Sequence, residues 1–240
     1  MKKIVLLLLA FSSFVAFSQE VTLKLNYKKG DSYSIKVEMN QNLGLMGGMK
    51  MTANMNMKIV DVSAENITSE AKIKRMVVDV LQGGSTVSFD SDNVDENDSD
   101  QKMMKQQFDP MMAAVITQVM DRRGKLVSFK TEPTVPGMDN FGQQSEYPKK
   151  ALKVGSTWDT EVTDNNAGTV KMSYKVSKIT KTTLFADITG SASALPGSKI
   201  TGMLEVDIAS GNPNKMNVLI ATDVQGSKIT VETKVTTTKN

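Results

Sequence analysis

The chain has 240 residues, of which 40% are hydrophobic, no cysteine, no histidine and a formal net charge of +3. This length is enough for one large β domain or two small ones, and the nearly balanced charge gives no reason to expect nucleic acid as a partner. A sequence without Cys and His excludes disulfide bonds, a Ser-His-Asp or Cys-His nucleophile, and ordinary zinc or iron ligation. We therefore expect no metal, no cofactor and no enzymatic activity.

Residues 1–18 have the pattern of a secretory signal peptide. Lys2 and Lys3 precede an uncharged apolar run over residues 4–17, and Ala16 and Ser18 stand at the positions that favour cleavage before Gln19. The run is shorter than the ~20 residues of a spanning helix. We expect an exported protein, periplasmic or extracellular, with no transmembrane segment and no lipid anchor, because no cysteine follows the cleavage point.

Most of the remaining chain alternates apolar and polar residues, as half-buried antiparallel strands do. Gly, Asn, Asp and Pro collect between the alternating segments, which predicts short turns. The fold class is mainly β, with a curved sheet, a half-barrel or a sandwich as the architecture. The expected strands cover residues 21–26, 32–39, 49–62, 67–80, 169–179, 184–188, 200–208, 216–222 and 229–236.

One expected strand, MKMTANMNMKI at residues 49–59, carries methionine at nearly every second position. The ordinary interpretation is a core filled by adaptable thioethers, and the sharper one is a groove that accepts an apolar ligand. A copper site is disfavoured, because strand residues two apart are separated by about 6.6 Å and the chain lacks His and Cys. The candidate groove residues are Met46, Met49, Met51, Met55 and Met57, with Met104 and Met112 facing them and residues 43–49 as a flexible flap.

The segment over residues 90–148 interrupts the strand pattern. It opens with the acidic run DSDNVDENDSD, whose spacing does not match a calcium loop and which we interpret as a solvated connector. Asp109 and Pro110 form a typical N-cap and first-turn pair. Residues 115–121 either continue that helix or form a hairpin with 126–130; the alternation of Ile116, Gln118 and Met120 favours the hairpin. Residues 131–148 are an expected linker.

The two ends of the mature chain resemble each other. YKKGDSYSIKV (27–37) aligns with LKVGSTWDTEV (152–162), and MKIVDVSAENITSEA (57–71) aligns with YKVSKITKTTLFADI (174–188). We interpret residues 19–89 and 149–240 as two related β-meanders that flank one short helical insert. Tyr33 and Trp158 occupy equivalent places, and we expect both to pack at the start of their meanders.

Two carboxylate pairs, Asp159 with Glu161 and Glu205 with Asp207, are the remaining candidates for catalysis. Each pair lies on alternate positions of an expected strand and so shares one face. Hydrolases need such a pair to flank a substrate cleft. The sequence indicates no cleft, so surface acids are the favoured interpretation.

Several short motifs together resemble a family of uncharacterised, secreted, β-rich bacterial envelope proteins. They are GDSY (30–33), FDS (89–91), DRRGKLVSF (121–129), YPKKALKVGSTW (147–158) and GMLEVDIASG (202–211). The resemblance implies a secreted β-rich fold and carries over no activity, cofactor or catalytic residue. The expected architecture is similar to periplasmic lipid-carrier half-barrels. We expect a non-enzymatic protein that binds an apolar or lipid-like ligand in a methionine-lined groove. The alternative is a structural or adaptor protein of the cell envelope that contacts another protein without a pocket.

Overall fold

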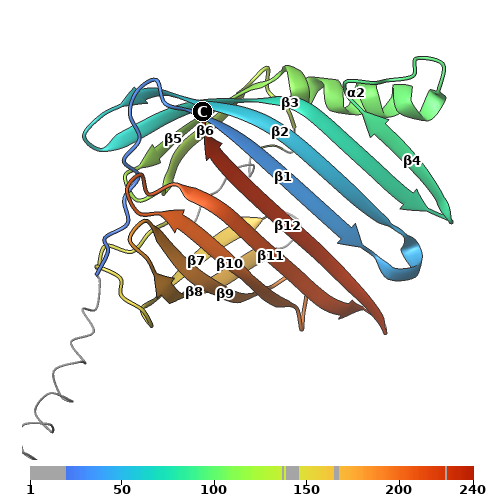
Figure 1. Ribbon diagram of the computed structural model, residues 1–240. Helices are drawn as coiled ribbons and strands as arrows, with labels where there is room; N and C mark the ends of the chain where they lie inside the picture. The colour runs from blue at the N-terminus through green and yellow to red at the C-terminus, as the bar shows by residue number, and fades with distance from the viewer. Residues whose placement is uncertain (1–19, 137, 139–145, 165–167, 225) are drawn as a thin grey trace, which may run out of the picture.

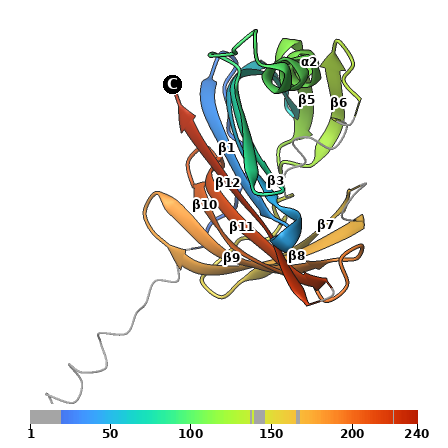
Figure 2. The same ribbon diagram turned by 90° about the vertical axis from the view of Figure 1, so that its right-hand side faces the viewer.

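One curved antiparallel sheet dominates the computed structural model, which describes residues 20–136, 138, 146–164, 168–224 and 226–240 (Figures 1 and 2). The predicted signal peptide and part of the predicted linker lie outside these residues. The sheet has 12 strands in the order β6-β5-β3-β2-β1-β12-β11-β10-β9-β8-β7, and β4 also pairs with β3. The mainly-β prediction is confirmed.

The strands of the first half are β1 (Ser32–Asn42), β2 (Gly48–Val62), β3 (Asn66–Gln82), β4 (Ser85–Asp90), β5 (Val115–Asp121) and β6 (Leu126–Glu132). Those of the second half are β7 (Thr157–Asp164), β8 (Gly168–Ile179), β9 (Thr183–Ala192), β10 (Lys199–Asp207), β11 (Pro213–Val224) and β12 (Ser227–Lys239). The last strand, β12, pairs with β1 and so joins the halves into one sheet. The other elements are the 3-10 turn η1 (Gly44–Met46) and the helix α2 (Ser99–Ala113).

Alternation along the strands gives the sheet two different faces. In β1, Tyr33, Ile35 and Val37 point to the concave side, which we name the inner face, and the polar residues between them point to the convex outer face. The same alternation continues through the register into every neighbouring strand. Apolar side chains therefore predominate on the concave surface, where β12 places Thr233 and Thr237 beside Val231 and Val235.

The two halves repeat the same contacts at their first hairpins. Tyr33 pairs with Met57 across β1 and β2, and Trp158 pairs with Tyr174 across β7 and β8. These are the positions that the sequence alignment makes equivalent. Equivalent backbone hydrogen bonds precede each pair, from Gly30 N to Ile59 O and from Gly155 N to Val176 O, both at 2.8 Å. The first hairpin of each half therefore begins with the same pattern of pairing.

Residues 20–27 were predicted to contain a strand, and here the structure differs. The segment is extended, but its one ladder contact is an isolated bridge between Val21 and Leu152. Leu23, Leu25 and Tyr27 are buried in the core. The apolar alternation therefore arises because one side of the segment packs on the inner face at one end of the sheet. Its polar side remains exposed.

The helix begins earlier than predicted. Asp98 is the N-cap, because its carboxylate accepts hydrogen bonds from the backbone N–H groups of Asp100 and Gln101 at 2.9 and 3.1 Å. The prediction of Asp109 as N-cap was wrong: Pro110 lies in the last turn, near the end of the helix at Ala113. The predicted hairpin after the helix is confirmed, since β5 pairs with β6.

Two clusters of buried apolar side chains occupy the inner face. The first surrounds Tyr33, Trp158 and Tyr174 and includes residues 21–27 at one end of the sheet. The second, which contains Met55, Met76 and Phe89, lies beneath α2. Figure 2 views α2 almost end-on, between β4 and the β5–β6 hairpin. Ile35 packs against both clusters, so it lies between them on the inner face.

Candidate ligand-binding site

The inner face is not fully covered by the two clusters. Apolar side chains on the central strands stay half-exposed although they point into the concavity. In β1 and β2 these include Val37 and Met51, and Met39 pairs directly with Met51. Half-exposed apolar side chains on a concave surface are typical of sites for apolar ligands. The set across the central strands is Ile35, Val37, Met39, Met49, Met51, Ile220, Val231 and Val235.

The methionine-rich strand is extended, as predicted, and its sulfur-bearing side faces inward. Met55 and Met57 are buried, with exposed fractions of 6% and 5%. Met49 and Met51 are half-buried and pack against the second cluster. Met57 belongs to the first cluster instead. The strand thus divides into a buried part that fills the core and a half-exposed part that is accessible from the concavity.

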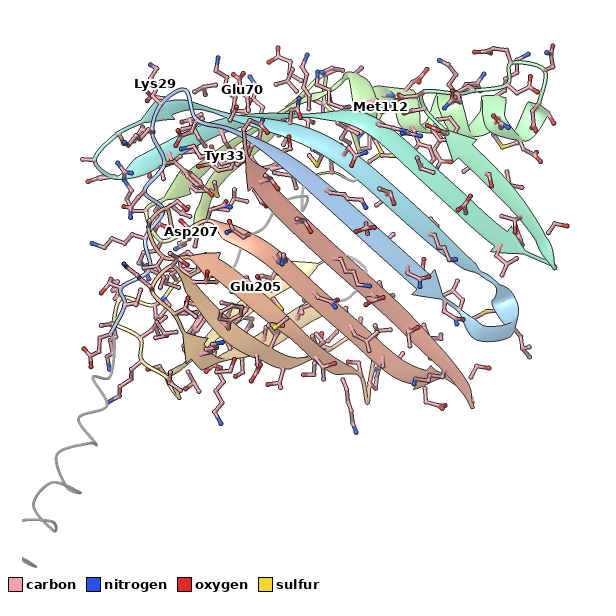
Figure 3. All side chains as sticks on the ribbon, viewed as in Figure 1. Lys29, Tyr33, Glu70, Met112, Glu205 and Asp207 are labelled. Carbon is pink, nitrogen blue, oxygen red and sulfur yellow. The ribbon has the colours of Figure 1, made fainter. Side chains whose placement is uncertain are left out.

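The methionines in and after the helix have different surroundings. Met104, Met111 and Met112 pack against the second cluster, with Met112 at the end of α2 beside β3 (Figure 3). Met103 points to solvent, and Met120 is buried in the first cluster.

Met46 lies apart from the other candidates. It is 64% exposed on η1, beside Leu45, whose side chain is fully exposed. Both residues are at the tip of the β1–β2 hairpin, which is the predicted flap.

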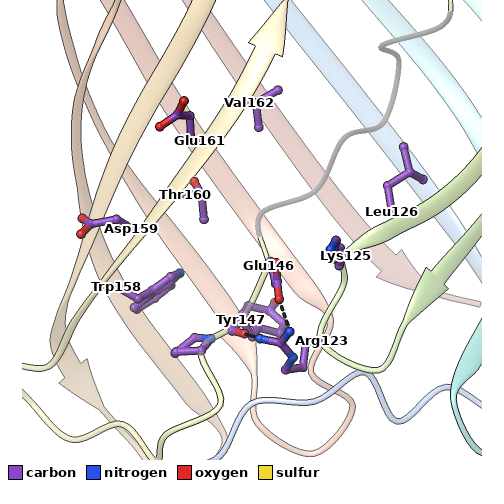
Figure 4. A pocket seen from close by; sticks show the side chains of 11 residues that line it. Arg123, Lys125, Leu126, Glu146, Tyr147, Trp158, Asp159, Thr160, Glu161 and Val162 are labelled. Carbon is purple, nitrogen blue, oxygen red and sulfur yellow. Dashed lines mark hydrogen bonds and ion pairs between the residues drawn. The ribbon is translucent and has the colours of Figure 1, made fainter.

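A separate pocket of about 550 Å³ lies where the two edges of the sheet approach each other (Figure 4). We name it the mouth pocket. Its walls come from the β5–β6 turn, from residues 146–148 and from β7, which are distant in the sequence. The lining residues are Arg123, Lys125, Leu126, Glu146, Tyr147, Pro148, Trp158, Asp159, Thr160, Glu161 and Val162.

Two buried polar atoms in this pocket have no hydrogen-bond partner among the described residues. They are the indole Nε1 of Trp158 and the hydroxyl Oγ1 of Thr160. Trp158 is only 6% exposed, so water cannot freely satisfy its N–H group. Leaving a buried donor unpaired costs about 1–3 kcal/mol. Two neighbouring inward positions of β7 therefore carry polar groups that are candidates to bind a water or a ligand.

The charged groups of the mouth pocket are unequally paired. Arg123 forms an ion pair with Glu146, and its guanidinium is 4.0 Å from the carboxylate of Asp121. Lys125 is exposed at the rim and has no ion pair within the part of the chain that the structure describes. Tyr147 is buried, and its hydroxyl donates to the carbonyl of Gly211 at 3.0 Å. Burial raises the pKa of Tyr147 well above its ordinary value, so its ring stays neutral.

The acidic candidates lie on the outer face. Asp159 accepts a hydrogen bond from Ser173, and Glu161 lies 3.6 Å from the ammonium of Lys171. On β10, Glu205 pairs with Lys215 at 3.5 Å, and Asp207 accepts from the hydroxyl of Ser210 at the strand end (Figure 3). Within the described ranges, no group of three or more acidic, His or Cys side chains could hold a metal ion.

Part of the acidic run is structural rather than solvated. Asp90 accepts two hydrogen bonds from the guanidinium of Arg75, at 3.0 and 2.6 Å. These bonds, followed by the one from Asn93, hold the pKa of Asp90 well below its ordinary value. Together with Asp98 at the helix N-cap, Asp90 fixes both ends of the run, which positions α2 beside the second cluster.

The mouth pocket was not found by sequence reasoning. Trp158 was expected to pack, and it does, stacking on Tyr174 with ring centroids 4.7 Å apart. The unpaired indole donor was missed, as were Arg123, Lys125 and Glu146. The sequence contained one indication of the pocket. Alternate residues of β7 face the same side of the sheet, so Thr160 lies on the same side as Trp158, the only tryptophan of the chain.

Comparison with protein-family models gave no match, and comparison with curated proteins gave none either. A solved structure described as "Lipid-protein interactions in lipovitellin" matches with a TM-score of 0.50 and 10% identity, over 89% of this chain and 25% of that chain. The chain thus spans about a quarter of the length of lipovitellin. This likeness shows a shared β fold.

A structure of MucB in complex with MucA(peri) matches at 8% identity over 87% of this chain and 89% of that chain, but its TM-score of 0.15 is too low to indicate a common fold. Over the residues that the structure describes, α2 is far too short and polar to cross a membrane, and no other helix there could do so.

Proposed function

We propose that the protein is a non-enzymatic, exported binding protein that holds an apolar or lipid-like ligand on the inner face of its sheet. The half-exposed apolar side chains of the central strands carry this proposal. A fold that needed only stability would cover them, because each buried apolar side chain contributes about 1.5–3 kcal/mol. Met49 and Met51 suit such a surface, since unbranched thioethers adapt to ligands of different shape.

The shared fold with lipovitellin supports the same proposal. That structure is described by its lipid-protein interactions, and the matched region covers nearly the whole of the present chain. A curved sheet with an apolar concave side offers a long surface to a hydrocarbon chain.

Binding of the fluorescent probe N-phenyl-1-naphthylamine tests the proposal. We expect the wild type to bind the probe, Met51→Lys to weaken binding at least about tenfold, and Thr52→Lys to leave it unchanged. Met51 and Thr52 are half-buried neighbours in β2 whose side chains point to opposite faces of the sheet. Both variants add one positive charge to the same strand, but only Met51→Lys places it on the inner face. Thermal melting verifies that both variants fold. An unbound probe, or equal binding by both variants, would contradict the proposal.

An adaptor role is the second candidate, and one observation favours it. Leu45 and Met46 expose their apolar side chains at the tip of the β1–β2 hairpin, away from both core clusters. Exposed apolar residues of this kind mark surfaces for other proteins. Replacing both with Ser leaves probe binding intact if the inner face is the functional surface. Two results together would favour the adaptor role. The wild type would bind no probe, and the double Ser variant would no longer capture the cell-envelope proteins that the wild type captures in a pull-down.

A further inference from the structure

The mouth pocket has two unpaired hydrogen-bond donors on β7, in a wall that also carries charged side chains. The Trp158 indole is fixed by its stack on Tyr174, with ring planes 8° apart. Its N–H group is buried and has no acceptor among the described residues, and the same holds for the hydroxyl of Thr160, two positions further along β7. Both residues line the pocket. Figure 4 shows the indole turned toward Tyr147 across the pocket. An indole N–H can only donate, so its partner must be an acceptor.

Two basic and three acidic residues line the pocket, and their pairing decides which charge is left free. Of the three ionisable side chains that reach the pocket from the β5–β6 turn and residue 146, Arg123 and Glu146 neutralise each other. Lys125, which has no ion pair within the described ranges, then remains as the positive charge at the rim. Asp159 and Glu161 engage Ser173 and Lys171 on the outer face. The pocket is thus suited to an oxygen acceptor that carries negative charge.

The β7 wall of the pocket, which carries Trp158 and Thr160, is continuous with the inner face of the sheet. Thr160 pairs with Met172, and Val162 pairs with Val170, across β7 and β8. Met172 and Val170 are half-buried and pack against the first cluster. From them the inner face extends strand by strand to the central strands. A ligand with its polar end at Trp158 therefore has an apolar path for its chain.

We infer that the mouth pocket binds the anionic head group, a carboxylate or a phosphate, of a single-chain amphiphile whose hydrocarbon chain lies along the inner face. The inference rests on the proposed function and names its ligand class. Trp158 and Thr160 donate hydrogen bonds to the head group, and Lys125 supplies the charge. The Arg123–Glu146 pair forms the base of the pocket and holds residues 146–148 against the β5–β6 turn.

The only tryptophan of the chain is a direct reporter for this pocket. The test measures Trp158 fluorescence and calorimetric binding for dodecanoate, dodecyl phosphate and dodecylamine, all below their micellar concentrations. We expect the two anions to change the emission and to bind at least about tenfold more tightly than the amine. The tighter of the two anions identifies the head group as carboxylate or phosphate.

Matched variants locate the binding. Thr160→Val keeps the side-chain shape and removes the hydroxyl, and we expect it to weaken anion binding about fivefold. Thr163→Val makes the same change on the outer face of β7 and should have no effect. Lys125→Gln should reduce the preference for anions over the amine. Trp158→Phe, followed by calorimetry, should weaken anion binding about tenfold.

The outcomes separate the two proposals. Equal binding of dodecylamine and dodecanoate, or unchanged anion binding in both Thr160→Val and Trp158→Phe, overturns the head-group inference and leaves inner-face binding standing. Binding of none of the three amphiphiles, together with no binding of the naphthylamine probe, overturns the proposed function and with it the inference.

Discussion

Trp158 stacks on Tyr174 with nearly parallel rings, 4.7 Å between their centroids, at the start of the β7–β8 hairpin. Both rings are buried, and Tyr174 is completely inaccessible. The stack therefore fills the end of the first cluster and also fixes the indole edge that faces the mouth pocket. One contact thus connects the stability of the sheet with the geometry of the candidate head-group site.

Removing the ring of Tyr174 should destabilise the protein strongly. We expect Tyr174→Ala to lower the free energy of unfolding by about 3–5 kcal/mol, because it leaves a cavity beside Trp158. Tyr174→Phe retains the stack and removes the hydroxyl, which donates to the Met172 sulfur at 3.7 Å, so it should cost about 1 kcal/mol. Urea unfolding followed by circular dichroism measures both. Equal stabilities of the two variants would contradict a structural role for the ring.

The Arg75–Asp90 pair should make stability depend on pH in the acidic range. Its hydrogen bonds lower the pKa of Asp90 in the folded state below that in the unfolded chain. The stabilisation is therefore complete above the unfolded pKa of about 4 and is lost as the pH falls through the lower folded value. We expect Asp90→Asn to melt at a lower temperature than the wild type near pH 7.

The difference in melting temperature between wild type and Asp90→Asn should shrink steadily as the pH is lowered from about 4 to about 2. Asp61→Asn is the control, because its exposed pair with Lys29, at 3.6 Å, contributes little. A difference between wild type and Asp90→Asn that stays constant down to the lowest pH would show that the carboxylate charge is not the cause.

Local patterns predicted most of the strands but not how segments meet in space. Alternation located β2 and β3 to within a few residues because each has one apolar face. The same pattern in residues 21–26 suggested a strand, since alternation reports one-sided burial and not backbone pairing. The N-cap was misplaced because Asp98 stands inside an acidic run, where one capping aspartate looks like its neighbours.

The mouth pocket could not be predicted, for a different reason. Its donors lie on β7, whereas Arg123 and Lys125 lie in the β5–β6 turn and Glu146 follows the linker. The curvature of the sheet brings these segments together, and no spacing in the sequence encodes that curvature. The inward row of methionines on β2 was easier to predict, because Met49, Met51, Met55 and Met57 alternate along one strand.

The two parts of the methionine strand should respond differently to truncation. Met55 is buried in the second cluster, so Met55→Ala should lower the free energy of unfolding by about 2–5 kcal/mol. Met49 is half-buried at the edge of the same cluster, and Met49→Ala should cost about 1 kcal/mol or less while weakening probe binding. Urea unfolding and probe titration measure the two effects. A Met49 variant with normal probe affinity would exclude Met49 from the ligand surface.

Gly211 holds residues 20–27 close to the β10–β11 turn, and its replacement should release that segment. Gly211 has φ of +69°, and an added Cβ would lie 1.9 Å from the carbonyl oxygen of Lys24. Gly197 has a similar φ of +75° with nothing within 4 Å, so it isolates the backbone cost, about 1 kcal/mol, from the collision.

We expect Gly211→Ala to expose the peptide bond after Lys24 to trypsin, because the collision displaces the backbone that donates from Leu25 N to Arg122 O at 2.8 Å. Gly197→Ala should be cleaved there at the wild-type rate. Mass spectrometry of the fragments over time measures the cleavage. Equal rates of cleavage after Lys24 in both variants would mean that the segment is held by its buried side chains and not by the close approach at Gly211.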